Sequence, residues 1–338
     1  MTVLTGGSSP ERDVALAGAA EVVKALRAAG HTVSVVDTVT GPLSPDRQAA
    51  LLTGAVDREP PTPEELRSLR ERELGPAMVD LPELRGADVV FPVLHGRQGE
   101  GGELQALLQL AGIPFTGSDA LGSAIAMAKD VAKGLLRNAG ITTPDWAMWP
   151  SSPEETAALG LPLVVKPSRV GSTIGLSVID SLGQLEDAVA VARDYDDDIL
   201  LETFIRGREL TVGILGNTAL AVGEIIPDHA HFDYECKYTP GLTQEIFPAD
   251  LDGATTAALQ ATALAAHRVL KLRDSSRIDF IQTSSGTAYC LEANTLPGLT
   301  RTSLLPQSAE AAGIPFPELC AKMCDLALDR HHGTKAAC

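Results

Sequence analysis

Two strand-like stretches near the C-terminus, residues 277–279 and 291–294, constrain the fold of this chain more than any other feature. A Ser- and Gly-rich segment separates them, and a two-residue loop at Ser285-Gly286 would join them as an antiparallel hairpin. Counting outward from that loop predicts two polar cross-strand pairs: Asp279 with Glu292 and Arg277 with Asn294. Because side chains two apart on a strand share a face, all four groups should point to the same side.

The predicted pair of Asp279 and Glu292 needs a compensating charge, because directly opposed carboxylates destabilise a bare hairpin. A divalent cation with hard oxygen ligands would turn that repulsion into binding. Arg277 beside such a metal would be placed to hold a transferring phosphoryl group. The alternative interpretation is the polar outer face of an ordinary hairpin, and the pair alone does not decide between the two.

Composition and charge limit the class of protein. The 338 residues predict two or three domains, and the net charge of −17 argues against a nucleic-acid-binding surface. No apolar run approaches the roughly 20 residues of a membrane span. We expect no signal peptide, because Met1 leads directly into an apolar strand. The five cysteines form no disulfide pattern, which indicates reduced thiols in a cytoplasmic protein.

The N-terminal third has the pattern of an α/β domain with a parallel sheet. A helix predicted over 10–29 separates strand-like runs at 3–5 and 31–36. A largely apolar run at 88–94 adds a strand. A Gly-rich loop and a helix follow it, and a run at 113–116 predicts the last strand of the domain.

Residues 40–85 are rich in Pro and charge, and we interpret them as a peripheral insertion with one helix over 63–74. Further along, helices are expected over 118–140, 253–271 and 316–329, with a Pro-rich linker over 144–153. In chain order, the strands expected between them cover 163–166, 176–179, 199–202, a pair over 209–226, and the hairpin. These elements predict an N-terminal domain over 1–117, a central part over 118–202 and a C-terminal part over 203–338.

Two lysines are candidate phosphate ligands. Lys166 ends a strand and precedes a loop over 167–175 that contains glycines and hydroxyl side chains. This loop leads into a strand, unlike the Walker motif, whose Gly-Lys-Ser/Thr leads into a helix. Lys129 is the second candidate. The alternatives are an ordinary Gly-Ser turn and a solvated helix lysine.

A candidate slot for a nucleotide base lies between two strands. Glu202 ends an apolar strand and Glu209 begins the next. Phe204 and Ile205 between them would line an adenine, and Glu209 would reach the ribose. A carboxylate beside a glycine turn also occurs without any ligand, so both interpretations stay open.

Six segments that span nearly the whole chain form one ordered set. They cover 6–14, 94–100, 165–169, 233–238, 277–279 and 292–300, with the sequences GGSSPERDV, LHGRQGE, VKPSR, DYECKY, RID and EANTLPGLT. This set resembles the signature motifs of D-alanine–D-alanine ligases, a family of the ATP-grasp superfamily. The second and the last segments are together quite specific.

The resemblance implies an α/β (α+β) ATP-grasp fold with an N-terminal parallel-sheet domain and ATP held between two sheets. On the nucleotide it implies seven residues: Lys129, Lys166 and Lys237, then Glu202, Phe204, Ile205 and Glu209 around adenine and ribose. It also implies two Mg²⁺ ions, for which Mn²⁺ can substitute, on Asp279, Glu292 and Asn294.

The implied reaction joins two D-alanines through a D-alanyl phosphate, with formation of ADP, for peptidoglycan precursor synthesis. Glu11 would take the first ammonium and would form a hydrogen-bonded triad with Ser172 and Tyr238. His95 would lie near the substrates. The resemblance assigns the second substrate and the developing oxyanion to four residues: Arg277, Gly298, Ser303 and Leu304.

An acyl phosphate would hydrolyse in contact with water, so a closing lid is expected. The polar stretch 228–249 contains Tyr234, Lys237 and Tyr238 and has the length and composition of such a lid. In the family, Tyr at 238 accompanies dipeptide synthesis, so an amine is expected as the second substrate. One departure is Ala128, where the family usually has Asp before the lysine, and we expect a modest effect.

Two alternative functions are weighed against this one. The first is a related ATP-grasp ligase of specialised metabolism or inhibitor self-resistance that acts on D-alanine analogues or other D-amino acids. The second is an inactive nucleotide-binding regulator, which the presence of Arg277, Asp279 and Glu292 disfavours. The resemblance and the prevalence of twofold assemblies predict a homodimer with small-molecule substrates and no nucleic-acid or membrane partner.

Overall fold

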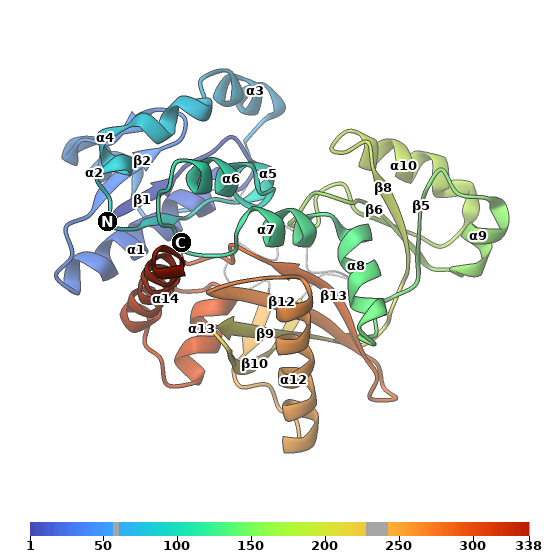
Figure 1. The fold of residues 1–338 in the computed structure, drawn as a ribbon. Helices are drawn as coiled ribbons and strands as arrows, with labels where there is room; N and C mark the ends of the chain where they lie inside the picture. Colours follow the sequence, from blue (N-terminus) through green and yellow to red (C-terminus); the bar gives the residue numbers. More distant parts are fainter. Residues whose placement is uncertain (57–60, 228–242, 338) are drawn as a thin grey trace.

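Three separate β-sheets organise the chain in a computed structural model that describes residues 1–56, 61–227 and 243–337 (Figure 1). The sheets follow one another along the sequence and form three lobes, and the second lobe lies apart from the first. No helix within the described ranges is both long and apolar enough to cross a membrane. The site described below lies where these lobes meet.

The N-terminal sheet has the strand order β3-β2-β1-β4, and β1 runs parallel to β2 and β4. Its strands are β1 (Thr2–Thr5), β2 (Ser34–Asp37), β3 (Gly41–Pro42) and β4 (Val90–Pro92). Helix α1 (Arg12–Ala28) joins β1 to β2, so the predicted strand–helix–strand unit is confirmed. The strand predicted at 113–116 is reduced to one bridge between Val90 and Phe115. Pro114 lacks the N–H that would extend this ladder.

The insertion over 40–85 is only partly peripheral. It forms α2 (Pro45–Leu51), α3 (Pro63–Glu71), the 3₁₀ helix η1 (Gly75–Asp80) and α4 (Pro82–Arg85). Thr62 and Glu65 build a capping box that starts α3. Met78 and Leu84, however, are buried in one cluster with Leu4, so the peripheral interpretation is wrong for this half. Helices α5 (Gly96–Glu100) and α6 (Glu103–Leu110) follow β4.

The helix expected over 118–140 is broken into α7 (Ala120–Met127) and α8 (Lys129–Asn138). The break lies at Ala128, whose ψ of 93° is extended and whose side chain cannot cap α8. The carboxylate that the resemblance leads us to expect at this position is therefore absent from the start of α8.

The second sheet has the order β5-β8-β6-β7, with antiparallel neighbours throughout. Its strands are β5 (Trp146–Trp149), β6 (Leu163–Pro167), β7 (Ser177–Ile179) and β8 (Ile199–Thr203). Strand β5 lies in the segment 144–153 that we predicted to be a linker, so that prediction is wrong. The prolines at 144 and 150 only bracket an edge strand, a position that tolerates Pro. Helices α9 (Pro153–Ala158), η2 (Leu182–Gln184) and α10 (Leu185–Arg193) complete this lobe.

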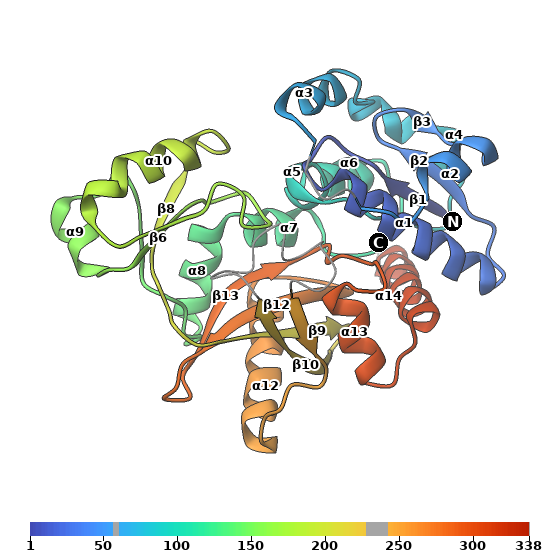
Figure 2. The ribbon, with the colours of Figure 1, turned by 180° about the vertical axis from the view of Figure 1, so that it is seen from behind.

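The third sheet has the order β11-β10-β9-β12-β13. Its strands are β9 (Arg208–Leu215), β10 (Thr218–Pro227), β11 (Thr243–Ile246), β12 (Ser275–Gln282) and β13 (Ala288–Asn294). Helix α12 (Gly253–Val269) packs on it, and α13 (Leu304–Ala311) was not predicted. The C-terminal helix α14 (Phe316–Ala337) shares a buried core with α1 (Figure 2). Of the expected lid, 228–242 lies outside the described residues, and β11 occupies part of the remainder.

The register of the predicted hairpin is confirmed where it matters, because Asp279 pairs with Glu292 and Arg277 with Asn294. The predicted two-residue loop is nevertheless wrong. The amide of Thr283 donates to the carbonyl of Thr287 across three loop residues, of which Gly286 has a φ of +86°. An extra residue in β13, Leu291, shifts the register back. The turn and this β-bulge offset each other.

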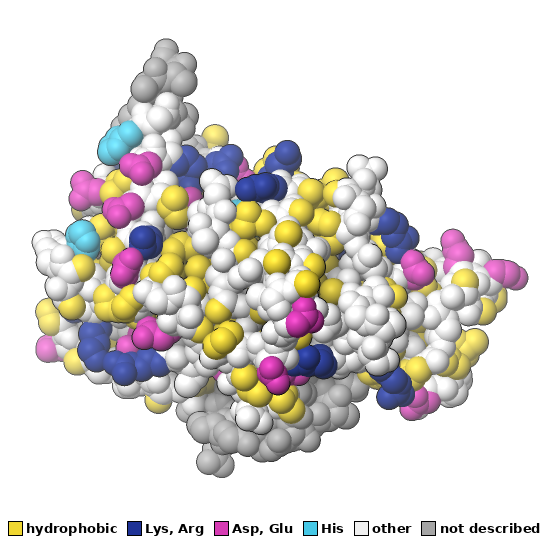
Figure 3. Space-filling view, turned by 90° about the horizontal axis from the view of Figure 1, so that it is seen from below, with side chains coloured by type: hydrophobic (Ala, Val, Ile, Leu, Met, Phe, Trp, Pro, Cys, Tyr) yellow, Lys and Arg dark blue, Asp and Glu magenta, His cyan; other side chains and the backbone are white. Residues whose placement is uncertain are grey.

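Figure 3 shows the face that lies below in Figure 1. Basic, acidic and hydrophobic side chains are interspersed on it. No continuous basic stripe, which a nucleic-acid surface would require, crosses the described part of this face.

Candidate active site

The larger of two adjoining cavities lies between the second and third sheets. Its volume is about 600 Å³, within the range of small-molecule sites. Six of the residues predicted to contact nucleotide line it: Lys129, Lys166, Glu202, Phe204, Ile205 and Glu209. The seventh, Lys237, lies outside the described residues.

The two predicted phosphate lysines reach the cavity from different elements. Lys129 is the first residue of α8, and its ammonium donates to the carbonyl of Val170 at 2.8 Å and pairs with Glu292 at 3.2 Å. Lys166 lies near the end of β6 and pairs with Glu202 at 2.8 Å. The Gly- and hydroxyl-containing loop over 167–175 lies between them. Two ammonium groups and a glycine-containing loop beside the cavity suit a polyphosphate.

Glu202 is engaged by two lysines rather than one. Its second oxygen accepts from Lys133 at 2.5 Å, and Lys133 also donates to the hydroxyl of Thr143 at 2.8 Å. Burial alone would raise the pKa of Glu202, but the charges of Lys166 and Lys133 outweigh it and lower that pKa. The carboxylate is therefore ionised, and both of its oxygens face cations.

The base end of the cavity follows β8. Phe204 and Ile205 leave the sheet there, and the guanidinium of Arg206 lies over the Phe204 ring at 5.3 Å from its centroid. Glu209, in β9, lies opposite Ile281 of β12. An apolar wall beside a carboxylate suits a nucleoside.

The predicted metal ligands lie on neighbouring strands at the edge of the same cavity. Asp279 accepts from Nε and Nη2 of Arg277 at 2.9 and 2.8 Å, from Asn294 at 2.9 Å and from the Thr211 hydroxyl at 2.7 Å. Asp279 and Glu292 both line the cavity. Within the described ranges no three His, Cys, Asp or Glu side chains gather as a metal site, so Asn294 would have to supply the third donor. A donor set of carboxylate and amide oxygens fits Mg²⁺.

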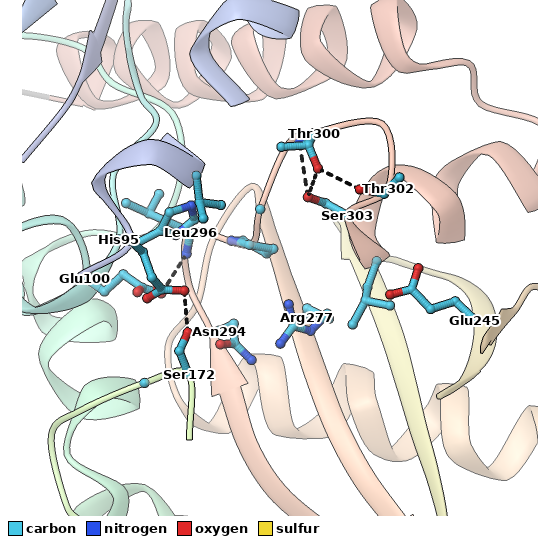
Figure 4. Close-up of a pocket in the computed structure, with 16 residues that line it drawn as sticks. His95, Glu100, Ser172, Glu245, Arg277, Asn294, Leu296, Thr300, Thr302 and Ser303 are labelled. Carbon is cyan, nitrogen blue, oxygen red and sulfur yellow. Dashed lines mark hydrogen bonds between the residues drawn. The ribbon is translucent and has the colours of Figure 1, made fainter. Parts of the chain in front are cut away.

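A smaller pocket adjoins this cavity and contains all six residues predicted to bind amino acid: Glu11, His95, Arg277, Gly298, Ser303 and Leu304. Figure 4 shows His95, Glu100 and Ser172 on one side of it, Glu245 on the other, and Arg277 and Asn294 between them. Four residues line both spaces: Gly171, Ser172, Arg277 and Leu304. The two ligand spaces are therefore continuous at Arg277.

Glu11 is held by a residue from a distant part of the chain. Its carboxylate accepts a hydrogen bond from the hydroxyl of Ser172, a residue 161 positions away. Ser172 and Thr173 have φ values of +58° and +61°, which a non-glycine residue adopts only under constraint. The third member of the predicted triad, Tyr238, lies outside the described residues.

The loop before Glu11 is built around a buried ion pair. Arg12 pairs with Asp37 at 2.5 Å and donates to the carbonyl of Gly7 at 2.8 Å. A Cβ on Gly6, whose φ is +88°, would lie 2.3 Å from the Asp37 carboxylate. The Gly-Gly turn of the motif is therefore required for this ion pair to close under Glu11.

The turn before α13 carries the other predicted substrate contacts. The hydroxyl of Ser303 accepts from the amide of Thr300 at 3.0 Å, and a Cβ on Gly298 would lie 2.7 Å from that hydroxyl. Ser303 is the N-cap of α13 and Leu304 its first residue. The N-terminus of a helix favours negative charge, which suits a carboxylate or an oxyanion.

Sequence reasoning missed three charged residues of this site, Lys133, Glu100 and Glu245. Lys133 lies four residues after Lys129, a spacing that places both on one helix face. Glu100 ends the His-Gly-Arg-x-Gly-Glu segment and lines the smaller pocket. Glu245, in β11, faces that pocket and is held by the Gln307 amide. The spacing of four residues from Lys129 could have revealed Lys133, whereas only the fold brings Glu245 into the site.

Burial perturbs the titration of His95 and Glu100 in the smaller pocket. Burial lowers the pKa of His95, Glu11 partly opposes this, and the described residues offer no partner to Nε2 of His95. Burial, and then the charge of Glu11, raises the pKa of Glu100 to about 7, although its oxygens accept from the amides of Gly96 and Leu296 at 3.1 and 3.4 Å. His95 is therefore neutral near pH 7, and Glu100 titrates there.

Substituting Glu100→Gln is expected to stabilise the protein above pH 7. Between the ordinary pKa of 4.5 and the raised value of about 7, the folded state binds more protons than the unfolded state, so stability falls as the pH rises. The amide keeps an acceptor oxygen without the charge. Urea unfolding at pH 8 should give a free energy of unfolding about 1–3 kcal/mol above wild type, with the difference vanishing near pH 5.

Glu103→Gln is the matched control, since the Glu103 side chain is 58% exposed and pairs only at the surface with Arg97. It should change stability by less than about 0.5 kcal/mol at either pH. An E100Q protein that is less stable than wild type at pH 8 would contradict the buried charge at Glu100.

Comparisons with known proteins agree with this geometry. The model of the D-ala D-ala ligase N-terminus matches residues 1–118, and that of the D-ala D-ala ligase C-terminus matches residues 135–325. The D-alanine--D-alanine ligase of Desulfotalea psychrophila is 39% identical over 99% of this chain and 97% of its own length. That of Nitratidesulfovibrio vulgaris is 40% identical over 96% of this chain and 97% of its own length.

Solved structures give the same result. The D-alanine-D-alanine ligase of Coxiella burnetii has a TM-score of 0.81 at 29% identity and covers 99% of this chain and 95% of its own. The Bacillus anthracis D-alanine--D-alanine ligase complexed with ATP has a TM-score of 0.78 at 27% identity, over 98% of both chains. The predicted ATP-grasp fold is confirmed. Both halves of the sequence and the whole fold thus lead to one conclusion: this chain belongs to the D-alanine–D-alanine ligase family.

Proposed function

We propose that this protein uses ATP to join two D-alanines into D-alanyl-D-alanine, a precursor of peptidoglycan. The observation that carries the proposal is the continuity of the two ligand spaces at Arg277. A cavity of nucleotide size meets a pocket with charged groups for an amino acid, so a γ-phosphate and a carboxylate can be brought together. The relatives are named D-alanine--D-alanine ligases, which favours this function over a ligase of specialised metabolism.

The larger cavity would hold ATP with its phosphates toward the ends of β6 and α8. Lys129, Lys166 and Lys237 would neutralise the phosphates, Phe204 and Ile205 would enclose adenine, and Glu209 would bind the ribose. Positioning and charge neutralisation are the main requirements of phosphoryl transfer. The solved relative from Bacillus anthracis that is complexed with ATP supports ATP as the ligand.

Asp279, Glu292 and Asn294 would hold two Mg²⁺ ions, with Mn²⁺ as a substitute. Bound metal would supply charge neutralisation at the terminal phosphate. The support comes from the oxygen-donor chemistry of the opposed carboxylates in β12 and β13, whose charges Arg277 and Lys129 compensate in the structure.

The chemistry would proceed in two steps. A carboxylate oxygen of the first D-alanine, whose ammonium Glu11 binds, attacks the γ-phosphorus, and ADP leaves. The amine of the second D-alanine, after loss of a proton, attacks the acyl carbon, and the C–O bond to phosphate breaks. Attack of the amine gives a tetrahedral intermediate, whose oxyanion Arg277 and the amide of Gly298 stabilise until the C–O bond breaks. Ser303 and Leu304 hold the second substrate.

The finer features of the prediction are also part of the proposal. We place the protein in the cytoplasm as a homodimer, with Ser172 and Tyr238 orienting Glu11 and the stretch 228–249 acting as the lid. We divide the chain at 117 and 202, with each part contributing one sheet or most of one. The N-terminal and C-terminal family matches support the first of these boundaries.

Release of phosphate from ATP tests the function directly. We expect release that depends on D-alanine and on Mg²⁺, with stoichiometric D-alanyl-D-alanine detected by mass spectrometry. L-alanine is the matched control and should give background rates. Phosphate release that does not depend on an amino acid would contradict the proposal.

A further inference from the structure

Lys133 is among the most deeply buried charged groups of the described chain, with a side-chain exposure of 1%. It contacts three groups: the Glu202 carboxylate at 2.5 Å, the Thr143 hydroxyl at 2.8 Å and the Trp146 ring, whose centroid is 5.2 Å from its ammonium. It is not among the described residues that line the nucleotide cavity. Burial of a charge is costly, and an apolar residue of similar volume is often at least as stable in its place. We therefore ask what the charge of Lys133 contributes to the site.

Lys133 belongs to a cluster of three charges that spans two elements. Glu202 in β8 lies between Lys133 in α8 and Lys166 in β6, with one carboxylate oxygen toward each. One negative and two positive charges leave one positive charge in surplus. Lys133 is sealed off, whereas the Lys166 side chain is 12% exposed and lines the cavity. The surplus positive charge is therefore presented to a ligand at Lys166.

The same helix, α8, also contacts the loop over 167–175. Lys129 lies one turn before Lys133 and holds the carbonyl of Val170, and Asp130 accepts from the hydroxyl of Ser168 at 3.0 Å. Helix α8 thus contacts the loop through its first turn and the β6–β8 strand pair through Lys133. Helix α8 therefore positions both parts of the predicted phosphate site, the loop and the strand pair.

We propose that Lys133 and Glu202 form a positioning pair for Lys166, in which Lys133 shares the Glu202 carboxylate so that the Lys166 ammonium is available to the phosphates of ATP. This inference rests on the proposed function, which places ATP in the cavity. Lys133 itself touches no substrate. Glu202 acts on the two lysines through both of its carboxylate oxygens.

Removal of Lys133 has a defined electrostatic consequence. Glu202 would then have Lys166 as its only cationic partner in the described cluster, and the surplus positive charge would disappear. Lys166 and Glu202 would then form a buried, neutral ion pair. Drawing Lys166 away from Glu202 toward a phosphate would be costly, because it would leave the Glu202 carboxylate buried without a cation. Phosphate affinity would fall, while the base and ribose contacts at Phe204, Ile205 and Glu209 would remain.

Isothermal titration with ATP and with adenosine separates these two parts of the ligand. Lys133→Met should weaken ATP binding about tenfold or more but change adenosine binding less than about twofold. In steady state the KM for ATP should rise while the KM for D-alanine changes little. Lys133→Arg, which keeps the charge, should restore most of the affinity for ATP.

A double-mutant cycle with Glu202→Gln tests whether Lys133 acts through Glu202. On the E202Q background, K133M should change ATP affinity less than about twofold, because the shared carboxylate is already absent. If K133M alone does not fold, E202Q is compared with the double variant, which lacks both buried charges, and a loss of ATP affinity well above about twofold between these two would overturn the proposal. Weakening of ATP binding by K133M that is equal on both backgrounds would overturn the proposal.

Arg137→Met is the matched control on the same helix, because Arg137 stacks on the same Trp146 ring at 4.1 Å but pairs at the surface with Asp145. It should leave ATP affinity unchanged. Equal losses of ATP and adenosine affinity in K133M would indicate a structural role and overturn the inference. A wild-type protein that binds ATP but makes no dipeptide would contradict the proposed function and not this one.

Discussion

Replacing Arg277 by Met is expected to lower kcat/KM for dipeptide formation by about 10³-fold or more. Arg277 lies at the junction of the two ligand spaces and is the one guanidinium among the described residues that lines both. Its charge would be needed both for the transferring phosphoryl group and for the oxyanion, which form only during the reaction. The loss should therefore appear in kcat more than in the KM for ATP.

The measurement is a coupled assay for ADP in which ATP is varied at saturating D-alanine and D-alanine is varied at saturating ATP. Arg85→Met is the control, because the Arg85 side chain is 51% exposed and pairs with Asp80 at the surface of the N-terminal domain. That variant should retain wild-type rates. An R277M protein within tenfold of the wild-type kcat would remove Arg277 from the reaction.

Asp279→Asn is expected to reduce ligation by a comparable factor, about 10²–10³-fold, by a different route. The substitution keeps the shape and one acceptor oxygen but removes the charge that opposes Glu292 across the ladder. Without Mg²⁺ the loss of like-charge repulsion offsets the loss of the Arg277 ion pair. The largest effect should therefore be on metal-dependent behaviour and not on the fold.

Thermal unfolding with ATP and increasing Mg²⁺ measures this separately from turnover. Wild-type protein should be stabilised as Mg²⁺ rises, and D279N should need much more Mg²⁺ for the same shift. Asp145→Asn, a change at a side chain that is 76% exposed, should behave as wild type. An unchanged Mg²⁺ dependence in D279N would exclude Asp279 as a ligand.

Local patterns predicted the hairpin because its two determinants act over short distances. Alternating buried and polar residues fix which side chains share a face, and Ile278, Phe280, Cys290 and Ala293 do lie in the core on the opposite side from the polar groups. The loop length and the β-bulge were not predictable separately. Their offsets cancel, so the pairing at Asp279 was right although the turn was wrong.

Contacts between distant segments were beyond sequence reasoning of this kind. The hydrogen bond between Glu11 and Ser172 depends on how the lobes pack. The sharing of Glu202 by two lysines depends on the pairing of β6 with β8 and on the position of α8, which no local period encodes. Strand β5 was missed because Pro is a strong breaker signal, although it only brackets this edge strand. The resemblance identified residues that lie in the six motif segments, whereas Lys133 and Glu245 lie outside those segments.

Transfer of ¹⁸O from substrate to phosphate tests the central claim most directly, namely that the chain activates a D-alanine carboxylate as an acyl phosphate. D-alanine labelled in both carboxylate oxygens would be incubated with ATP and Mg²⁺, and the released phosphate would be analysed by mass spectrometry. Attack of the carboxylate on the γ-phosphorus, followed by cleavage of the C–O bond, predicts one ¹⁸O atom in each phosphate. Dipeptide formation accompanied by unlabelled phosphate would contradict this account.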